Sequence, residues 1–164
     1  MEFSPLADER LPEADVLYLG GGYPELYRTE LEANVSMRRA VRKFVESGNR
    51  FYAECGGLIY LARSIDGAQM AGVLPVDIQM TDRLVDFGYC EITTQRQSVL
   101  GPAGTTARGH QFHYSRSMGT SGDAYAVRQG AREYFEGFLL PNGIASYVHL
   151  HFLSNPALAR TMLQ

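Results

Sequence analysis

The chain has 164 residues, of which 45% are hydrophobic and 20% are charged, and this balance predicts one folded domain over residues 1–164. Its net charge of −3, without a dense cluster of Lys and Arg, argues against a nucleic-acid partner and against a membrane partner. No apolar run reaches the roughly 18 residues that cross a bilayer, and no secretory signal opens the chain. The two cysteines are too few for a disulfide framework, so we expect free thiols, a cytoplasmic location and no metal site.

The first third of the chain alternates strand and helix patterns. Residues 15–19 form an apolar run that ends in the glycines of residues 20–22, which predicts a buried strand followed by a tight loop. Residues 37–45 place apolar side chains at the i, i+3, i+4 spacing of an amphipathic helix. Residues 50–54 predict a second buried strand, and a helical pattern resumes after Cys55. This order predicts an α/β fold with a mostly parallel sheet flanked by helices.

The rest of the chain changes to a pattern of short strands. Strands are expected over residues 86–93, 125–127, 134–139 and 144–149. Residues 98–109 are rich in Gly, Thr and Ala and predict a strand followed by a loop. The run Pro141-Asn142-Gly143 predicts a turn, and Asn155-Pro156 opens a short final helix. We therefore expect a later antiparallel β portion after the parallel one.

Cys55 stands between a predicted strand and a predicted helix, which favours a catalytic nucleophile. A tight turn at this point lifts the side chain from the sheet, as in nucleophile elbows that carry Ser. The start of the following helix is expected to lower the pKa of the thiol, and the backbone N–H of Gly56 points to the same place. Gly56 and Gly57 supply the small neighbours that such a turn needs. The alternative is a buried cysteine that only fills space.

The glycine run over residues 20–22 ends the neighbouring strand. Parallel strands finish at the same edge of a sheet, and this edge is where open α/β folds bind ligands. The run is therefore placed to offer a second backbone N–H to an oxyanion formed at Cys55. The alternative is that these glycines merely make a turn.

Histidine is the usual partner of a cysteine nucleophile, and the chain has four. The alternation along residues 145–152 puts His149 and His151 on one face of a predicted strand. Either could serve as the general base, and a metal pair or surface histidines are the alternatives. His110 and His113 follow a glycine-rich stretch, where they either line the mouth of a pocket or lie in a solvated loop.

Five runs along the chain together resemble one enzyme family. The runs are Ser4 to Pro12, Leu19 to Glu25, Tyr52 to Leu58, Gly109 to Ser115 and Ala145 to Phe152. In this order they resemble the C-terminal glutamine amidotransferase domain of the cobyrinic acid a,c-diamide synthase family, a class I, triad-type amidotransferase with a flavodoxin-like fold. The resemblance to the cobyric acid synthase type is weaker, because that type lacks the His-x-His pair. A different class I amidotransferase or a Cys hydrolase of the same fold stays open, as does a catalytically weak or silent domain that docks a synthetase.

The resemblance implies a role for each matching residue. Cys55 would attack the side-chain amide of glutamine, and His149 would take the thiol proton and pass it to the departing ammonia. The ammonia would serve an ATP-dependent synthetase that amidates the a and c carboxylates of a corrinoid in cobalamin biosynthesis. Oxyanion and substrate contacts would come from Gly21, Gly22, Tyr23, Gly56, His110, Gln111 and His113.

Three departures from the family pattern carry further expectations. His151 stands where many class I relatives have the Glu that orients the histidine, so His151 or another group must do this. Gln111 replaces the family's Glu. The chain has no phosphate-binding loop, so we expect no cofactor here, with ATP and Mg²⁺ held by a synthetase domain outside this chain. The family's first strand and helix also have no counterpart, which predicts an exposed sheet edge that favours a homodimer.

Overall fold

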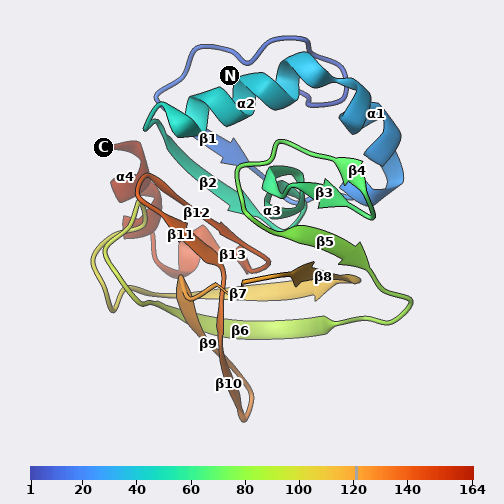
Figure 1. Ribbon diagram of the computed structural model, residues 1–164. Coiled ribbons are helices and arrows are strands. Elements are labelled where there is room, and N and C mark those ends of the chain that lie inside the picture. Colours follow the sequence, from blue (N-terminus) through green and yellow to red (C-terminus); the bar gives the residue numbers. More distant parts are fainter. Residues whose placement is uncertain (121) are drawn as a thin grey trace.

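The computed structural model describes residues 1–120 and 122–164, and its central element is a four-stranded sheet with the order β1-β2-β12-β11 (Figure 1). The strands are β1 (Val16–Leu19), β2 (Arg50–Glu54), β12 (Gly143–Ser146) and β11 (Phe138–Leu140). The first three run parallel, and only β11 runs antiparallel. Both expected strands of the first third are therefore present, and they end at the same edge of the sheet.

The helices are short, and α2 is the longest of those described. They are α1 (Arg28–Ala33), α2 (Val35–Glu46), α3 (Gly56–Leu61) and α4 (Ala157–Leu163), with 3₁₀ turns η1 (Pro24–Tyr27) and η2 (Phe152–Ser154). The Oδ1 of Asn34 caps α2 by accepting a hydrogen bond from the N–H of Met37 at 3.2 Å. The buried face of α2 carries Met37, Val41 and Val45, as the sequence spacing predicts.

A five-stranded antiparallel sheet with the order β10-β9-β6-β7-β13 forms the second half of the molecule, below the parallel sheet in Figure 1. Its strands are β10 (Arg132–Glu136), β9 (Tyr125–Gln129), β6 (Asp86–Thr94), β7 (Thr106–His113) and β13 (His149–Leu150). A small third sheet has the order β4-β3-β5-β8. Its strands are β3 (Ser64–Ile65), β4 (Ala68–Gln69), β5 (Asp77–Met80) and β8 (Ser115–Met118).

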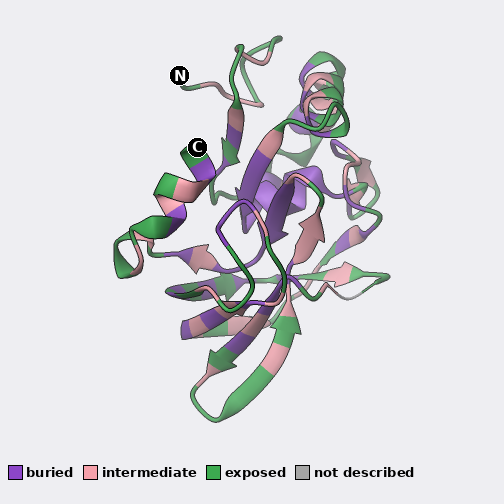
Figure 2. Ribbon diagram, turned by 90° about the vertical axis from the view of Figure 1, so that its left-hand side faces the viewer, coloured by how far each residue is buried: buried purple, intermediate pink, exposed green. Residues whose placement is uncertain are grey.

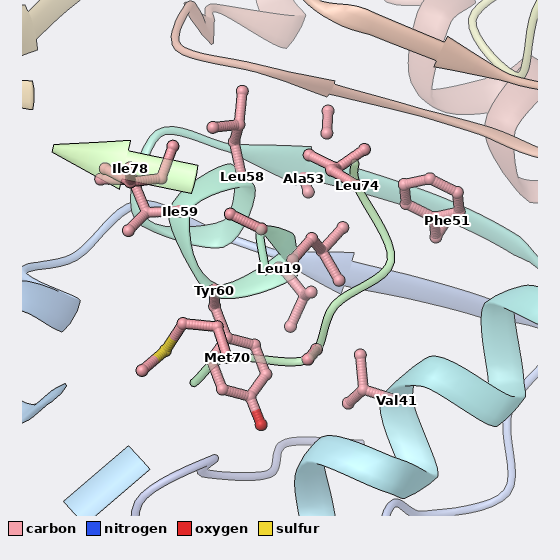
Figure 3. Close-up of a cluster of buried hydrophobic side chains, with 14 of the residues drawn as sticks. Leu19, Val41, Phe51, Ala53, Leu58, Ile59, Tyr60, Met70, Leu74 and Ile78 are labelled. Carbon is pink, nitrogen blue, oxygen red and sulfur yellow. The ribbon is translucent and has the colours of Figure 1, made fainter. Parts of the chain in front are cut away.

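Each half of the molecule has its own apolar cluster. Figure 3 shows side chains of α3, including Leu58 and Ile59, packed among Ala53 of β2, Leu74 and Ile78. The second cluster lies between the parallel and antiparallel sheets and contains Tyr52, Ile92, Val127, Ile144 and Val148. Exposed residues gather instead along β10 and the tip of its hairpin with β9, at the foot of Figure 2. Two clusters therefore replace the single core that length alone predicts.

Two expectations about strands are wrong. Residues 98–105 form turns and β7 begins at Thr106, so the loop precedes the strand. His110 and His113 consequently lie on a strand that alternates exposed and buried residues, not in a loop. The expected strand over residues 144–149 is also interrupted, because the chain leaves the parallel sheet after Ser146 and joins the antiparallel sheet at His149.

Strand β1 is an edge strand in the part of the chain that the structure describes. It pairs with β2, from Val16 opposite Arg50 to Leu19 opposite Ala53, and β2 alone neighbours it in the sheet. Within the described residues, the outer edge of β1 is therefore not paired with another strand.

Candidate active site

Cys55 occupies a strained turn between β2 and α3. Its backbone has φ 45° and ψ −100°, a positive φ that side-chain-bearing residues rarely adopt. The N–H of Cys55 donates a 2.7 Å hydrogen bond to the carbonyl of Ser146, which ties the turn to the end of β12. Strain of this kind costs roughly 1–3 kcal/mol and concentrates at functional sites. The turn therefore has the geometry that a nucleophile elbow requires.

The glycines of the two loops let their backbones touch at this turn. A Cβ added to Gly56 would lie 2.7 Å from the backbone nitrogen of Gly22, and one added to Gly57 would overlap the carbonyl oxygen of Leu19. Real Cβ atoms do not approach so closely, so neither position has room for a side chain. The loop after β1 and the start of α3 are therefore in contact, and the backbone nitrogen of Gly22 is brought beside Cys55.

The resting form of Cys55 is a thiol. Burial raises its pKa to about 11, and the carboxylates of Glu25, Glu54 and Glu136 add to this shift. The N–H of Gly56 acts in the opposite direction but does not overcome burial. The expectation that the helix start yields a thiolate is therefore wrong, because α3 is short and the sulfur lies in the interior. A base must remove the thiol proton before attack.

The chain turns sharply between β12 and β13, and this turn brings His149 to the site. The N–H of Tyr147 donates to Oε1 of Glu136 at 2.8 Å, and the N–H of Val148 donates to Oγ of Ser146 at 2.9 Å. Side chains thus satisfy the backbone donors that a continuous strand would pair. A Cβ added to Gly109 would overlap the carbonyl oxygen of His149, so β13 packs directly on the backbone of β7.

The His149 ring is held between the glycine loop and a second histidine. A Cβ added to Gly21 would overlap Cε1 of His149, which shows that the ring lies against this loop. On its other side the ring stacks on His110, with centroids 4.8 Å apart and planes 10° apart. Burial lowers the pKa of His149, and the neighbouring His110 and His113 lower it further. The imidazole is therefore neutral near pH 7 and fit to accept a proton.

Cys55 and His149 open onto one pocket of about 480 Å³. This volume falls within the usual range for small-molecule sites. The remaining residues that line it are Gly22, Tyr23, Phe87, Gly88, Tyr89, His110, Gln111 and Phe112. The pocket thus joins the turn of the parallel sheet to the face of β6 and β7.

Gln111 is the most deeply buried polar side chain of the pocket lining, with 1% of its surface exposed. The Tyr134 hydroxyl donates to its Oε1 at 2.7 Å, whereas its Nε2 has no partner in the part of the chain that the structure describes. An unpaired buried amide N–H is costly, so a bound acceptor at this point would be favoured.

Most, but not all, of the expected site residues meet in this pocket. Gly21 contributes to the site by contact with His149 and lines a neighbouring pocket together with Gly22 and Tyr23. His113 instead is buried, with Nδ1 2.9 Å from the carbonyl of Ser115, and stacks on Tyr147 at 3.9 Å. His151 is exposed and lies outside the pocket lining. His113 is therefore buried behind the pocket lining and His151 lies outside it, so the structure brings neither residue into the pocket.

The sequence pattern does not identify the pocket residues that come from β6. Phe87, Gly88 and Tyr89 lie on an expected strand, but nothing local marks them as pocket residues. Aromatic residues at positions that a strand exposes are the one signal that points to them.

Both cysteines are free, as expected. Within residues 1–120 and 122–164, three or more His, Cys, Asp or Glu side chains nowhere gather as a metal site would require, and no helix is long and apolar enough to cross a membrane.

The fold and the site together match a class I glutamine amidotransferase domain: a cysteine on a strand-to-helix turn, at the carboxyl edge of a parallel sheet, with a histidine lining the same pocket. The chain matches the model of the CobB/CobQ-like glutamine amidotransferase domain over residues 1–157 and belongs to this family. It is thus an enzyme domain of the amidotransferase type.

Curated relatives agree with this assignment. Cobyrinate a,c-diamide synthase of Methanothermobacter thermautotrophicus is 42% identical over 161 residues, which cover 96% of this chain and 36% of that protein. The protein of the same name from Salmonella typhimurium is 39% identical and is matched over 99% of this chain and 38% of its own length. The chain therefore spans a little over a third of these relatives.

Solved structures show the same fold at low sequence identity. A structure of PurLQS from Thermotoga maritima aligns with a TM-score of 0.68 and 14% identity, covering 96% of this chain and 82% of that chain. A glutamine amidotransferase structure aligns with a TM-score of 0.59 and 23% identity, covering 91% of this chain and 77% of that chain. The expected α/β class is confirmed, with a mostly parallel sheet and a later antiparallel β portion.

Proposed function

We propose that the chain hydrolyses glutamine through a thioester on Cys55 and supplies ammonia to an ATP-dependent synthetase. The observation that carries this proposal is the pocket shared by Cys55, on its strained turn, and His149, which is neutral near pH 7. A thiol with a pKa of about 11 needs such a base, and the neutral imidazole beside the glycine loop can serve as one.

The reaction proceeds in two halves. His149 takes the proton from Sγ of Cys55 as the sulfur attacks the side-chain carbonyl carbon of glutamine. The tetrahedral intermediate collapses when His149 returns this proton to the leaving nitrogen, which releases ammonia and leaves a glutamyl thioester. Water then attacks the thioester, with His149 again as base, and glutamate leaves as the thiol is restored.

Backbone donors are present for the oxyanion. The N–H of Gly56 is directed at the sulfur, and the backbone nitrogen of Gly22 lies beside Gly56. We assign these two N–H groups to the oxyanion, where donors of this kind are worth roughly 3–4 kcal/mol each. Tyr23, His110 and Gln111 are the side chains of the pocket lining that we assign to the rest of the glutamine.

The names of the curated relatives support a specific synthetase and substrate as partners of this domain. Because these are called cobyrinate a,c-diamide synthase, we propose that the ammonia amidates two carboxylates of a corrinoid in cobalamin biosynthesis. ATP and Mg²⁺ would be held by the synthetase unit, and the reaction would take place in the cytoplasm. The exposed edge of β1 would also allow two copies to pair, which sedimentation at several concentrations would test.

Labelling with a glutamine-analogue electrophile tests the proposed function. The chloroketone analogue of glutamine should modify Cys55 and spare Cys90, whose pKa burial also raises to about 11. Both thiols are buried and have raised pKa values, so neither feature by itself favours Cys55 over Cys90. Cys55→Ser should abolish the label, and free glutamine should protect against it. Equal labelling of both cysteines would contradict a catalytic role for Cys55.

A further inference from the structure

Glu54 immediately precedes the nucleophile, and only 4% of its surface is exposed. It ends β2 at the edge of the parallel sheet where Cys55 begins the turn. The proposed chemistry gives this side chain no role, yet burying a carboxylate is costly unless hydrogen bonds compensate it. The groups that contact Glu54 must therefore supply that compensation.

Three donors from three separate strands converge on the Glu54 carboxylate. The N–H of Leu150 donates to Oε1 at 2.7 Å, and the Tyr52 hydroxyl donates to the same oxygen at 3.1 Å. The Tyr18 hydroxyl donates to Oε2 at 2.7 Å. All three partners are donors, which suits an ionised carboxylate because it accepts only. Burial raises the pKa of Glu54, and these hydrogen bonds counter the shift.

The bond to Leu150 links the two catalytic residues. Leu150 directly follows His149 in β13, and Glu54 directly precedes Cys55, so one hydrogen bond joins the backbone of the base to the turn of the nucleophile. This bond also bridges the parallel and antiparallel sheets, whose strands do not pair with each other in the described part of the chain. The side chain of Glu54 thus spans the junction across which the base must reach the thiol.

The two tyrosines keep the carboxylate in place. Their rings stack with centroids 6.0 Å apart and planes 8° apart, and each donates to a different oxygen of Glu54. Phe152, just beyond the base in sequence, packs edge-on against both rings. The carboxylate therefore has little freedom to rotate.

We infer that Glu54 is a positioning residue, which fixes the strand of His149 against the turn of Cys55 and so takes the place of a third triad member. It acts through the backbone of Leu150 and does not touch the substrate. His151, by contrast, is exposed and lies outside the pocket lining. This inference rests on the proposed glutaminase function, because it assumes that proton transfer from Cys55 to His149 is required.

Glu54→Gln tests the inference with little change in volume. The amide has one acceptor atom in place of two and presents N–H groups to at least one of the three donors. We expect the maximal rate of Cys55 labelling by the chloroketone analogue to fall roughly 10- to 100-fold, as for misplaced catalytic groups and lost supporting hydrogen bonds. The concentration of analogue at half-maximal rate should change less than about twofold. A purely structural role would lower the thermal midpoint without this selective loss of rate.

Two tyrosine variants keep the test decisive if Glu54→Gln fails to fold. Tyr18 is 48% exposed on an edge strand, so Tyr18→Phe removes a donor to Glu54 without opening the core. We expect a fall of several-fold in the maximal labelling rate, with the half-saturating concentration unchanged. Tyr60→Phe is the matched control, because the buried Tyr60 hydroxyl has no partner in the part of the chain that the structure describes. It should label at the wild-type rate.

The outcomes separate the inference from the proposed function. If the wild-type chain is not labelled selectively at Cys55, the glutaminase proposal fails whatever Glu54 does. If the wild type is labelled but folded Glu54→Gln and Tyr18→Phe match its maximal rate, the positioning role is wrong. If Glu54→Gln does not fold, an unchanged rate in Tyr18→Phe overturns the inference.

Discussion

The two halves of the molecule build the site in different ways. In the parallel half, Cys55 and the glycines around it are neighbours in sequence, and their backbone sets the nucleophile. In the antiparallel half, His149 lies on β13, which pairs with β7 and packs on Gly109. The nucleophile is therefore positioned by local conformation, whereas the base is positioned by contacts between distant segments.

Cys55 and His149 are therefore held in position by different kinds of contact. A strained turn held by close backbone contacts has few alternatives, because each glycine fits a gap that no side chain fits. A two-residue strand has little stability of its own and depends on what holds it. We therefore expect substitution of the glycines packed around Cys55 to act mainly on folding, and changes in the contacts of His149 to act mainly on rate.

The largest effect should come from removal of the base. His149→Asn leaves a polar side chain but no group that accepts the thiol proton near pH 7. We expect the rate of Cys55 labelling by the glutamine analogue to fall roughly 10²- to 10⁴-fold. Single-turnover labelling checks this. The control is His151→Asn, an exposed residue outside the pocket, which should label at the wild-type rate. A larger loss in His151→Asn would reverse the assignment of the base.

A methyl group at Gly21 tests the contact between the two halves. Gly21→Ala would overlap Cε1 of His149, so the ring must move away from the pocket. We expect a loss of roughly 10- to 100-fold in labelling rate, since small misplacements of catalytic groups have effects of this size. Gly20→Ala is the matched control, because its Cβ makes ordinary contact at 3.6 Å with the Tyr18 ring. Equal rates in the two variants would show that the ring tolerates displacement.

The close packing around the turn at Cys55 should contribute to the free energy of unfolding. The Cβ that Gly57→Ala adds would overlap the backbone carbonyl of Leu19. It would also lie 2.8 Å from the Cβ of Leu19. Backbone atoms cannot yield as flexible side chains do, so we expect a loss of about 1–3 kcal/mol in the free energy of unfolding. Urea denaturation measures it, with Gly20→Ala again as the control. Unchanged stability in Gly57→Ala would mean that α3 shifts freely on β1.

The smallest expected effect is on the pH dependence of stability. It concerns Glu136, which holds the turn before His149. Burial raises the pKa of Glu136 to about 7, above its usual value of 4.5. An acid with a raised folded pKa binds more protons when folded, so its stabilising contribution is complete below pH 4.5 and is lost as the pH rises through 7. Because Glu136 is only partly buried, we expect this contribution to be about 1 kcal/mol.

Glu136→Gln isolates this contribution, since the amide keeps the size of the side chain but does not titrate. The difference between its free energy of unfolding at about pH 5 and at about pH 8 should be about 1 kcal/mol smaller than in the wild type. Glu133→Gln, exposed on the same strand, should show no such change. An unaltered pH dependence in Glu136→Gln would assign the titration to other groups.

The parts of the site that could be predicted from sequence are those whose cause is local. The run of strand, Cys55 and two glycines specifies a tight turn, and the glycines of residues 20–22 end the neighbouring strand. The amphipathic spacing of residues 37–45 likewise predicts α2. In each case the relevant neighbours lie within a few residues, so residue type and period carry the information.

The expectations that the structure contradicts were wrong for one physical reason. Each depended on contacts between segments that are distant in the sequence. Gly109 makes the sequence of β7 look less like a strand. A glycine is needed at this position because the backbone of His149 packs against it. Glu136, on the preceding β10 strand, draws the backbone of Tyr147 out of the expected strand. The pKa of Cys55 rises because the surrounding protein buries the sulfur, which the following helix alone does not reveal.

The sequence by itself determined the turn at Cys55 and the family, because short motifs in fixed order require particular backbone conformations. Only the tertiary structure decided which histidines line the pocket of Cys55, that burial raises the pKa of its thiol, and that Glu54 accepts a hydrogen bond from the strand of His149. Those features depend on distances and burial between residues 36 to 96 positions apart in the chain. Local pattern does not carry such information, because it arises only when the two sheets pack against each other.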